Sequence, residues 1–160
     1  MMDWLAEIHL INSVLGLVHT LFAVAAMVFG TVVLAKSKGT SAHVKIGYAY
    51  VGSMVFMNLT ALGIYNFGSL SLFHGFVVVS LLTLGLGIYP ALKRTHNWYY
   101  KHYYFMSWSV VGLYCAFWAE VGTRLLNMQY FWWIVMAATM LTAAIGGFII
   151  QYKAKFLKAS

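Results

Sequence analysis

The chain has 160 residues, of which 62% are hydrophobic and only 8% are charged. Soluble domains carry about 25% charged residues, so this composition offers too little polar surface for a water-soluble globule and predicts an integral membrane protein. The net charge of +7 does not indicate nucleic-acid binding, because Lys and Arg fall in short clusters between apolar stretches of membrane length.

Five apolar stretches are long enough to cross the hydrocarbon core, which takes about 20 residues of helix. In chain order they cover residues 10–34, 46–65, 70–90, 104–126 and 130–150. Pro90 is expected to end the third helix, because proline is poorly tolerated within a helix. The sequence therefore predicts an all-α fold, an integral membrane helical bundle of five transmembrane helices that forms one domain over residues 1–160.

The basic residues predict how this bundle is oriented. All but Arg124 gather in the first connection, in the third connection and in the tail: Lys36, Lys38, Lys45, Lys93, Arg94, Lys101, Lys153, Lys155 and Lys158. The connections at 66–69 and 127–129 carry no charge. Since Lys and Arg favour the cytoplasmic side, we expect the N-terminus outside and the C-terminus in the cytoplasm. The protein would then be a multi-pass protein of a bacterial inner membrane, with membrane lipid around it.

Four of the six histidines fall into two pairs by height. His19 and His74 each stand roughly 22–24 Å above the cytoplasmic end of their helix, at 1.5 Å of rise per residue. His43 and His102 lie at the cytoplasmic starts of the second and fourth helices. Alternate helices of a four-helix bundle lie diagonally across its core, so both pairs can converge there. Ionisable side chains at membrane depth are costly and usually mark an interior site.

Residues three or four apart share one face of a helix, which predicts the surroundings of each histidine. The face of His19 also holds Ala23, Ala26 and Gly30. The face of His43 holds Gly47, Met54 and Asn58. The face of His102 holds Met106, Ser109, Leu113, Phe117, Glu120 and Arg124. Small residues leave room for a flat group, but they are equally the usual means of close helix packing in lipid.

The first chemistry that fits these positions is the ligation of haem b. Two neutral imidazoles from facing helices bind the iron from opposite sides, and a four-helix bundle holds the macrocycle in its apolar core. The pairs His19/His74 and His43/His102 would hold two haems and form an electron path across the membrane. Arg124 can pair with a haem propionate.

Two other classes of function stay open. His19, His74 and Glu120 would supply two nitrogens and a carboxylate to a zinc or iron ion, although Glu120 can also pair with Arg124 one turn away. A third class is a non-catalytic subunit of a larger membrane complex or homo-oligomer. The fifth helix would offer it a close-packing face through Thr139, Thr142, Gly146 and Gly147.

A short stretch of the chain resembles a known signature. Lys38-Gly39-Thr40-Ser41-Ala42-His43, followed by Gly47, Tyr48 and Tyr50, is similar to that of a poorly characterised family of small bacterial multi-helix membrane proteins. His19, His102, Met106 and Arg124 match further marks of that family. The resemblance covers most of the first four helices and implies that these histidines do more than pack.

The positions of the histidine pairs also resemble those of the two-haem cytochrome b561 class. In that class four histidines on four consecutive helices ligate two haems. The similarity implies transmembrane electron transfer, with a redox partner. His19 and His74 would hold one haem, and His43 and His102 the other.

Overall fold

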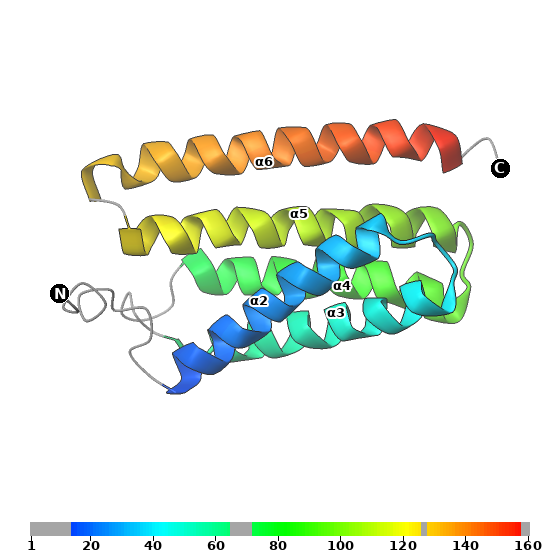
Figure 1. Cartoon of the computed structure of the whole chain (residues 1–160), viewed down its shortest axis with the longest axis horizontal. Coiled ribbons are helices and arrows are strands. Elements are labelled where there is room, and N and C mark those ends of the chain that lie inside the picture. The colour runs from blue at the N-terminus through cyan, green and yellow to red at the C-terminus, as the bar shows by residue number, and fades with distance from the viewer. Residues whose placement is uncertain (1–13, 65–71, 126–127, 158–160) are drawn as a thin grey trace. The chain divides into compact units, whose positions relative to one another are not determined.

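The computed structural model describes residues 14–64, 72–125 and 128–157 (Figure 1). In these stretches the chain forms five α-helices: α2 (Val14–Ala35), α3 (Ser41–Ala61), α4 (Leu72–Lys93), α5 (Trp98–Leu125) and α6 (Met128–Leu157). Each apolar segment of the sequence overlaps one of these helices. The all-α prediction is therefore confirmed.

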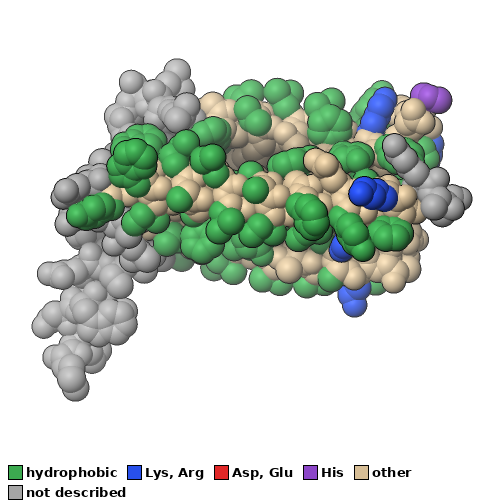
Figure 2. Space-filling model, turned by 90° about the horizontal axis from the view of Figure 1, so that it is seen from above, with side chains coloured by type: hydrophobic (Ala, Val, Ile, Leu, Met, Phe, Trp, Pro, Cys, Tyr) green, Lys and Arg blue, Asp and Glu red, His purple; other side chains and the backbone are tan. Residues whose placement is uncertain are grey.

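Three helices are long and apolar enough to cross a membrane, namely α2, α4 from His74 onwards and α6 from Trp132 onwards. Large apolar side chains on all three are turned outward; Leu21, Leu82 and Met140 are each at least 60% exposed. In Figure 2, hydrophobic side chains cover the middle of the visible helices, whereas the basic side chains lie near helix ends. Such an exposed apolar surface is typical of a protein surrounded by lipid.

The described helices belong to two compact units. The first contains α2, α3, α4 and the start of α5 up to Met106, and we call it the histidine unit because His19, His43, His74 and His102 all lie in it. The second contains α5 from Ser107 onwards and α6, and we call it the hairpin unit. The prediction that the whole chain forms one domain stays a prediction.

In the histidine unit, α3 packs against both α2 and α4. Tyr50 and Met54 of α3 are almost fully buried, and so are Ala26 and Gly30 of α2. The small residues on the face of His19 therefore serve close packing in this structure. Asn58 of α3 is also buried, and its Nδ2 donates to the hydroxyl of Ser80 on α4 at 3.1 Å. This hydrogen bond ties α3 to α4.

Pro90 does not end its helix, so that prediction is wrong. α4 continues for three residues beyond it, to Lys93. Proline removes one N–H and strains the turn before it, but it leaves the following residues able to complete a turn. The helix ends at Lys93, and the next residue, Arg94, has a left-handed backbone with a φ of 50°. The N–H of Thr95 then donates to the carbonyl of Pro90 at 3.3 Å.

In the hairpin unit, glycines of α6 lie directly against α5. A Cβ on Gly146 would come within 2.5 Å of Val111, and a Cβ on Gly147 within 3.2 Å of Trp108. The thiol of Cys115 on α5 donates to the carbonyl of Thr139 on α6 at 3.7 Å. Both glycines of the small-residue face that the sequence suggested for an external partner are therefore packed against this chain's own α5.

Candidate functional site

A tightly built turn positions His43 at the start of α3. Gly39 has a φ of 77°, a left-handed conformation that favours glycine. Thr40 caps the helix: its hydroxyl accepts a hydrogen bond from the N–H of His43 at 3.2 Å and donates to the carbonyl of Ser37 at 2.9 Å. The Lys38-to-His43 motif of the sequence thus forms the turn and the N-cap that orient His43 at the start of α3.

His102 lies in the second turn of α5 and is held by the neighbouring helix α4. Its Nδ1 donates to the carbonyl of Gly87 at 3.0 Å. Gly87 permits the close approach, since a Cβ there would lie 2.7 Å from the sulfur of Met106 and 3.2 Å from its backbone nitrogen. Because a carbonyl can only accept, Nδ1 of His102 carries the proton and its Nε2 keeps the lone pair.

The structure brings His43 and His102 together from separate helices. Their ring centroids are 6.4 Å apart and their planes are nearly perpendicular, at 82°. Metal–nitrogen bonds are about 2 Å long, so two imidazoles on opposite sides of one metal have ring centres about 6 Å apart. The spacing of this pair therefore fits a metal centre held between the two rings.

One nitrogen of this pair is left without a partner. Nδ1 of His43 is buried and has no hydrogen-bond partner among the described residues. A neutral imidazole has one N–H and one lone pair, and in the tautomer protonated at Nε2 the lone pair is on Nδ1. A buried, unused lone pair is costly, and a metal ligated there would satisfy it.

The surroundings of both rings lower the pKa of each imidazole. Both rings lie outside the segments 46–65 and 104–126 that are expected to span the membrane. Burial is the main factor that lowers the pKa of His43, and repulsion from Lys38 and from a protonated His102 lowers it further, whereas the backbone of Val33 raises it. Burial also lowers the pKa of His102, as does Lys38, while the bond to Gly87 raises it. Neutral imidazole is the form that binds metals.

His19 lies at the opposite end of α3 from His43. Its Nδ1 donates to the carbonyl of Met57 at 3.0 Å and contacts the hydroxyl of Thr60 at 3.2 Å. Met57 follows His43 by 14 residues, which places the two histidines roughly 21 Å apart along the helix. As in His102, a backbone carbonyl holds Nδ1, and this is the usual second contact of a metal-ligating histidine, whose Nε2 then binds the metal.

The remaining candidate residues are placed as follows. His74 is 8% exposed in the first turn of α4, at the same end of α3 as Met57. Glu120 is half-buried on the part of α5 that belongs to the hairpin unit, and the side chain of Arg124 lies outside the described residues. Within the described stretches no three His, Cys, Asp or Glu side chains come together as a metal-binding group. The site at His19, His74 and Glu120 stays a prediction, as does the role of Arg124.

The face of α5 that carries His102 is buried only in part. Ser109 and Leu113 are buried, as expected from their spacing, whereas Phe117 is 37% exposed. Sequence reasoning also missed Gly87, whose carbonyl holds the ring of His102. The absence of a side chain at Gly87 is a signal for close approach.

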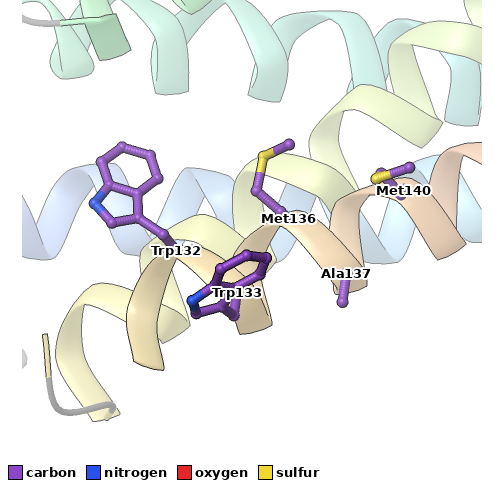
Figure 3. Close-up of a pocket in the computed structure, with 5 residues that line it drawn as sticks. All are labelled: Trp132, Trp133, Met136, Ala137 and Met140. Carbon is purple, nitrogen blue, oxygen red and sulfur yellow. The ribbon is translucent and has the colours of Figure 1, made fainter. Parts of the chain in front are cut away.

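A hollow of about 390 Å³ lies on α6, and none of the residues that line it is ionisable (Figure 3). It is lined by Trp132, Trp133, Met136, Ala137 and Met140. These residues follow one another at helical spacing, and the two methionines lie side by side along the helix in Figure 3. The hollow offers apolar contact only, so the histidine unit remains the candidate site.

No protein-family model, curated protein or solved structure matches this chain. The resemblances to a family of small bacterial membrane proteins and to the cytochrome b561 class therefore stay predictions. The function has to be argued from the geometry around His43 and His102.

Proposed function

We propose that this protein is a transmembrane electron carrier that binds haem b between His43 and His102 and a second haem between His19 and His74. The observation that carries the proposal is the pair of facing rings from α3 and α5, with centroids 6.4 Å apart. Haem bound there would exchange one electron between its ferric and ferrous states. The chain's own residues would hold the iron and keep water from it.

The hydrogen bonds around the rings support this assignment. His102 is oriented by the carbonyl of Gly87, and His19 by that of Met57. Outer partners of this kind fix the orientation and tautomer of a ligating histidine. The distance of roughly 21 Å along α3 between His43 and the carbonyl that holds His19 would separate two redox centres by most of the thickness of a hydrocarbon core.

We further propose that all five helices cross an inner membrane, with the N-terminus outside and the C-terminus in the cytoplasm. α3 and α5 are more polar than the other three helices, but polar side chains such as Asn58 and Ser107 are buried, so lipid need not solvate them. Fusions of a periplasm-active phosphatase and of a cytoplasm-active fluorescent protein to each connection test this arrangement. A phosphatase that is active when fused after Leu157 would contradict it.

An absorption spectrum of the detergent-purified protein tests the haem proposal. A Soret band that shifts on reduction with dithionite, with two haems per chain, is the expected result. The double variant His43→Gln/His102→Gln should keep one haem, and the exposed His96→Gln variant should keep both. A colourless wild-type protein purified from haem-replete cells would overturn the proposal.

A single metal ion in place of the haem of this pair is a second candidate, and one observation favours it. The unused nitrogen of His43 is Nδ1, and both ring nitrogens serve as ligands for zinc or copper. Elemental analysis of the same sample separates the two candidates. Stoichiometric zinc or copper without a Soret band would establish the ion, and loss of that metal in His102→Gln would place it.

A further inference from the structure

Two connections of the histidine unit carry its basic residues, and both lie at the same end of that unit (Figure 1). His43 follows the α2–α3 connection, and His102 follows the α4–α5 connection. Because the ring centroids of these histidines are 6.4 Å apart, the two connections are neighbours. The exposed basic residues in the connections or within two turns of them are Lys36, Lys38, Lys45, Lys93, Arg94 and Lys101. The structure thus gathers charges from two distant stretches of the chain into one surface, which we call the basic end.

No acidic side chain of the histidine unit balances the basic end. Residues 11–106 include no Asp or Glu. Lys38 donates to the carbonyls of Val33 and Leu34, at 3.2 and 3.3 Å, but a carbonyl carries no net charge. Like charges that are gathered in one place repel one another, most strongly where little salt screens them. The positive charge of the basic end is therefore balanced by anions from outside this unit.

Aromatic residues set the basic end at the level of lipid headgroups. The guanidinium carbon of Arg94 lies 4.1 Å from the ring centroid of Trp98, and that ring is in edge contact with Tyr99 at 5.5 Å. Trp and Tyr are enriched where hydrocarbon meets the headgroups, because one part of each ring is apolar and another is polar. The phosphate groups of lipids lie at this level. Clusters of about four to eight basic residues immediately beside membrane helices are typical of binding sites for anionic lipids.

We propose that the basic end binds the headgroup of an anionic phospholipid between the two connections, an assignment that goes beyond the proposed function and does not depend on haem. Ammonium and guanidinium groups are the usual donors to phosphate oxygens. Exposed apolar side chains stand beside the charges, at Val44, Tyr48 and Leu92, and would contact the acyl chains. The bound lipid would tie the α2–α3 connection to the α4–α5 connection and so hold His43 near His102.

Matched variants separate a lipid site from general surface charge. Lys45→Gln/Lys101→Gln removes one positive charge from each of the two connected regions of the basic end. Lys153→Gln/Lys155→Gln removes the same charge from exposed positions of α6, in the hairpin unit. Lys45→Arg/Lys101→Arg keeps the charge, so it separates the loss of charge from the replacement of the side chains.

Titration with phosphatidylglycerol, followed by native mass spectrometry, measures the affinity for an anionic lipid, with phosphatidylcholine as the reference. The wild type should bind phosphatidylglycerol more tightly than phosphatidylcholine. Each basic residue near a lipid surface contributes a factor of about five to the binding of an anionic lipid, so Lys45→Gln/Lys101→Gln should lower that affinity by about 30-fold. The Arg variant and the α6 variant should keep it. No preference in the wild type, or an equal loss in both Gln variants, would overturn the inference.

Thermal unfolding in lipid nanodiscs gives a second measurement. The wild type should unfold at a higher temperature with phosphatidylglycerol than with phosphatidylcholine, because a ligand of the folded state stabilises it. The gain should shrink in concentrated salt and in Lys45→Gln/Lys101→Gln. Soluble polyglutamate tests the rival partner, which is an acidic protein. Stabilisation by polyglutamate without stabilisation by phosphatidylglycerol would overturn the lipid assignment.

Discussion

The two ends of the histidine unit hold their histidines differently. At the end that carries Lys38, the rings of His43 and His102 lie next to each other, and the ring of His102 is bonded to the carbonyl of Gly87 on α4. At the other end, His19 is bonded to the carbonyl of Met57 on α3, and His74 is buried at the start of α4. One end thus holds two adjacent rings, whereas the other holds a histidine that is tied to its neighbouring helix.

This difference separates two roles that a membrane histidine can play. A ring held by an adjacent helix contributes to packing, while two imidazoles at ligand spacing, one of which keeps a buried nitrogen without a hydrogen bond, are arranged for a ligand. The pair of His43 and His102 has this arrangement, with Nδ1 of His43 as that nitrogen. The end at His43 therefore carries the functional argument, and variants at the two ends should differ in what they change.

The largest expected effect is the loss of a bound haem. His102→Ala should remove the haem held with His43 and leave the haem at His19, which halves the haem content measured as the pyridine haemochrome. His19→Ala should remove the other haem. If His19→Ala leaves the haem content unchanged while His102→Ala abolishes it, only the end at His43 binds haem. The two ends of the histidine unit would then differ in function as well as in structure.

A steric change at Gly87 should come next in size. Gly87→Ala would push a methyl group into Met106 and displace the carbonyl that holds His102. Overpacking of this kind costs about 1–3 kcal/mol, so thermal unfolding in detergent should begin at a lower temperature and the Soret band should weaken. Gly85→Ala is the control, because a Cβ there meets nothing within 4 Å. Equal behaviour of the two variants would argue against a role for the carbonyl of Gly87.

Acid should destabilise the end at His43. Both rings have a pKa below the ordinary value of about 6.5, so the folded protein resists protonation that the unfolded chain accepts. Stability should be constant above pH 7 and should fall as the pH drops below about 6.5. Unfolding temperatures between pH 8 and pH 5.5 measure this. The unfolding temperature of the His43→Gln/His102→Gln variant should depend less on pH. A dependence as steep as that of the wild type would mean that other groups cause the loss of stability in acid.

The smallest expected effects distinguish the two threonines that support these histidines. Thr40→Ala removes the cap of α3 and should cost about 1 kcal/mol of unfolding free energy, while Thr40→Ser should restore it. Thr60→Val removes one contact of His19, which keeps its bond to Met57, and should cost about 0.5 kcal/mol. Chemical denaturation in mixed micelles compares them. A larger loss of unfolding free energy in Thr60→Val than in Thr40→Ala would contradict this prediction.

The sequence by itself determined the five helices and the two heights of the histidines. Apolar length and the rise per residue are local properties, so they can be counted along the chain. The helix starts were less well determined. α3 begins at Ser41 and not at residue 46, because Thr40 caps it, and α4 runs past Pro90 because the left-handed residue that ends it is Arg94. Caps and left-handed residues depend on backbone conformation that an apolar pattern does not report.

Only the tertiary structure decided what each histidine touches. The carbonyls of Met57 and Gly87 hold the rings of His19 and His102, yet every residue has a carbonyl, so no side-chain pattern singles these two out. From the sequence, the small residues around Ala26 could make room for a bound group, and those around Gly146 could contact a partner protein. In the structure Ala26 is buried and Gly146 lies against α5 of this chain. Which helices approach closely depends on complementary surfaces far apart in the sequence, and that is set only when the chain has folded.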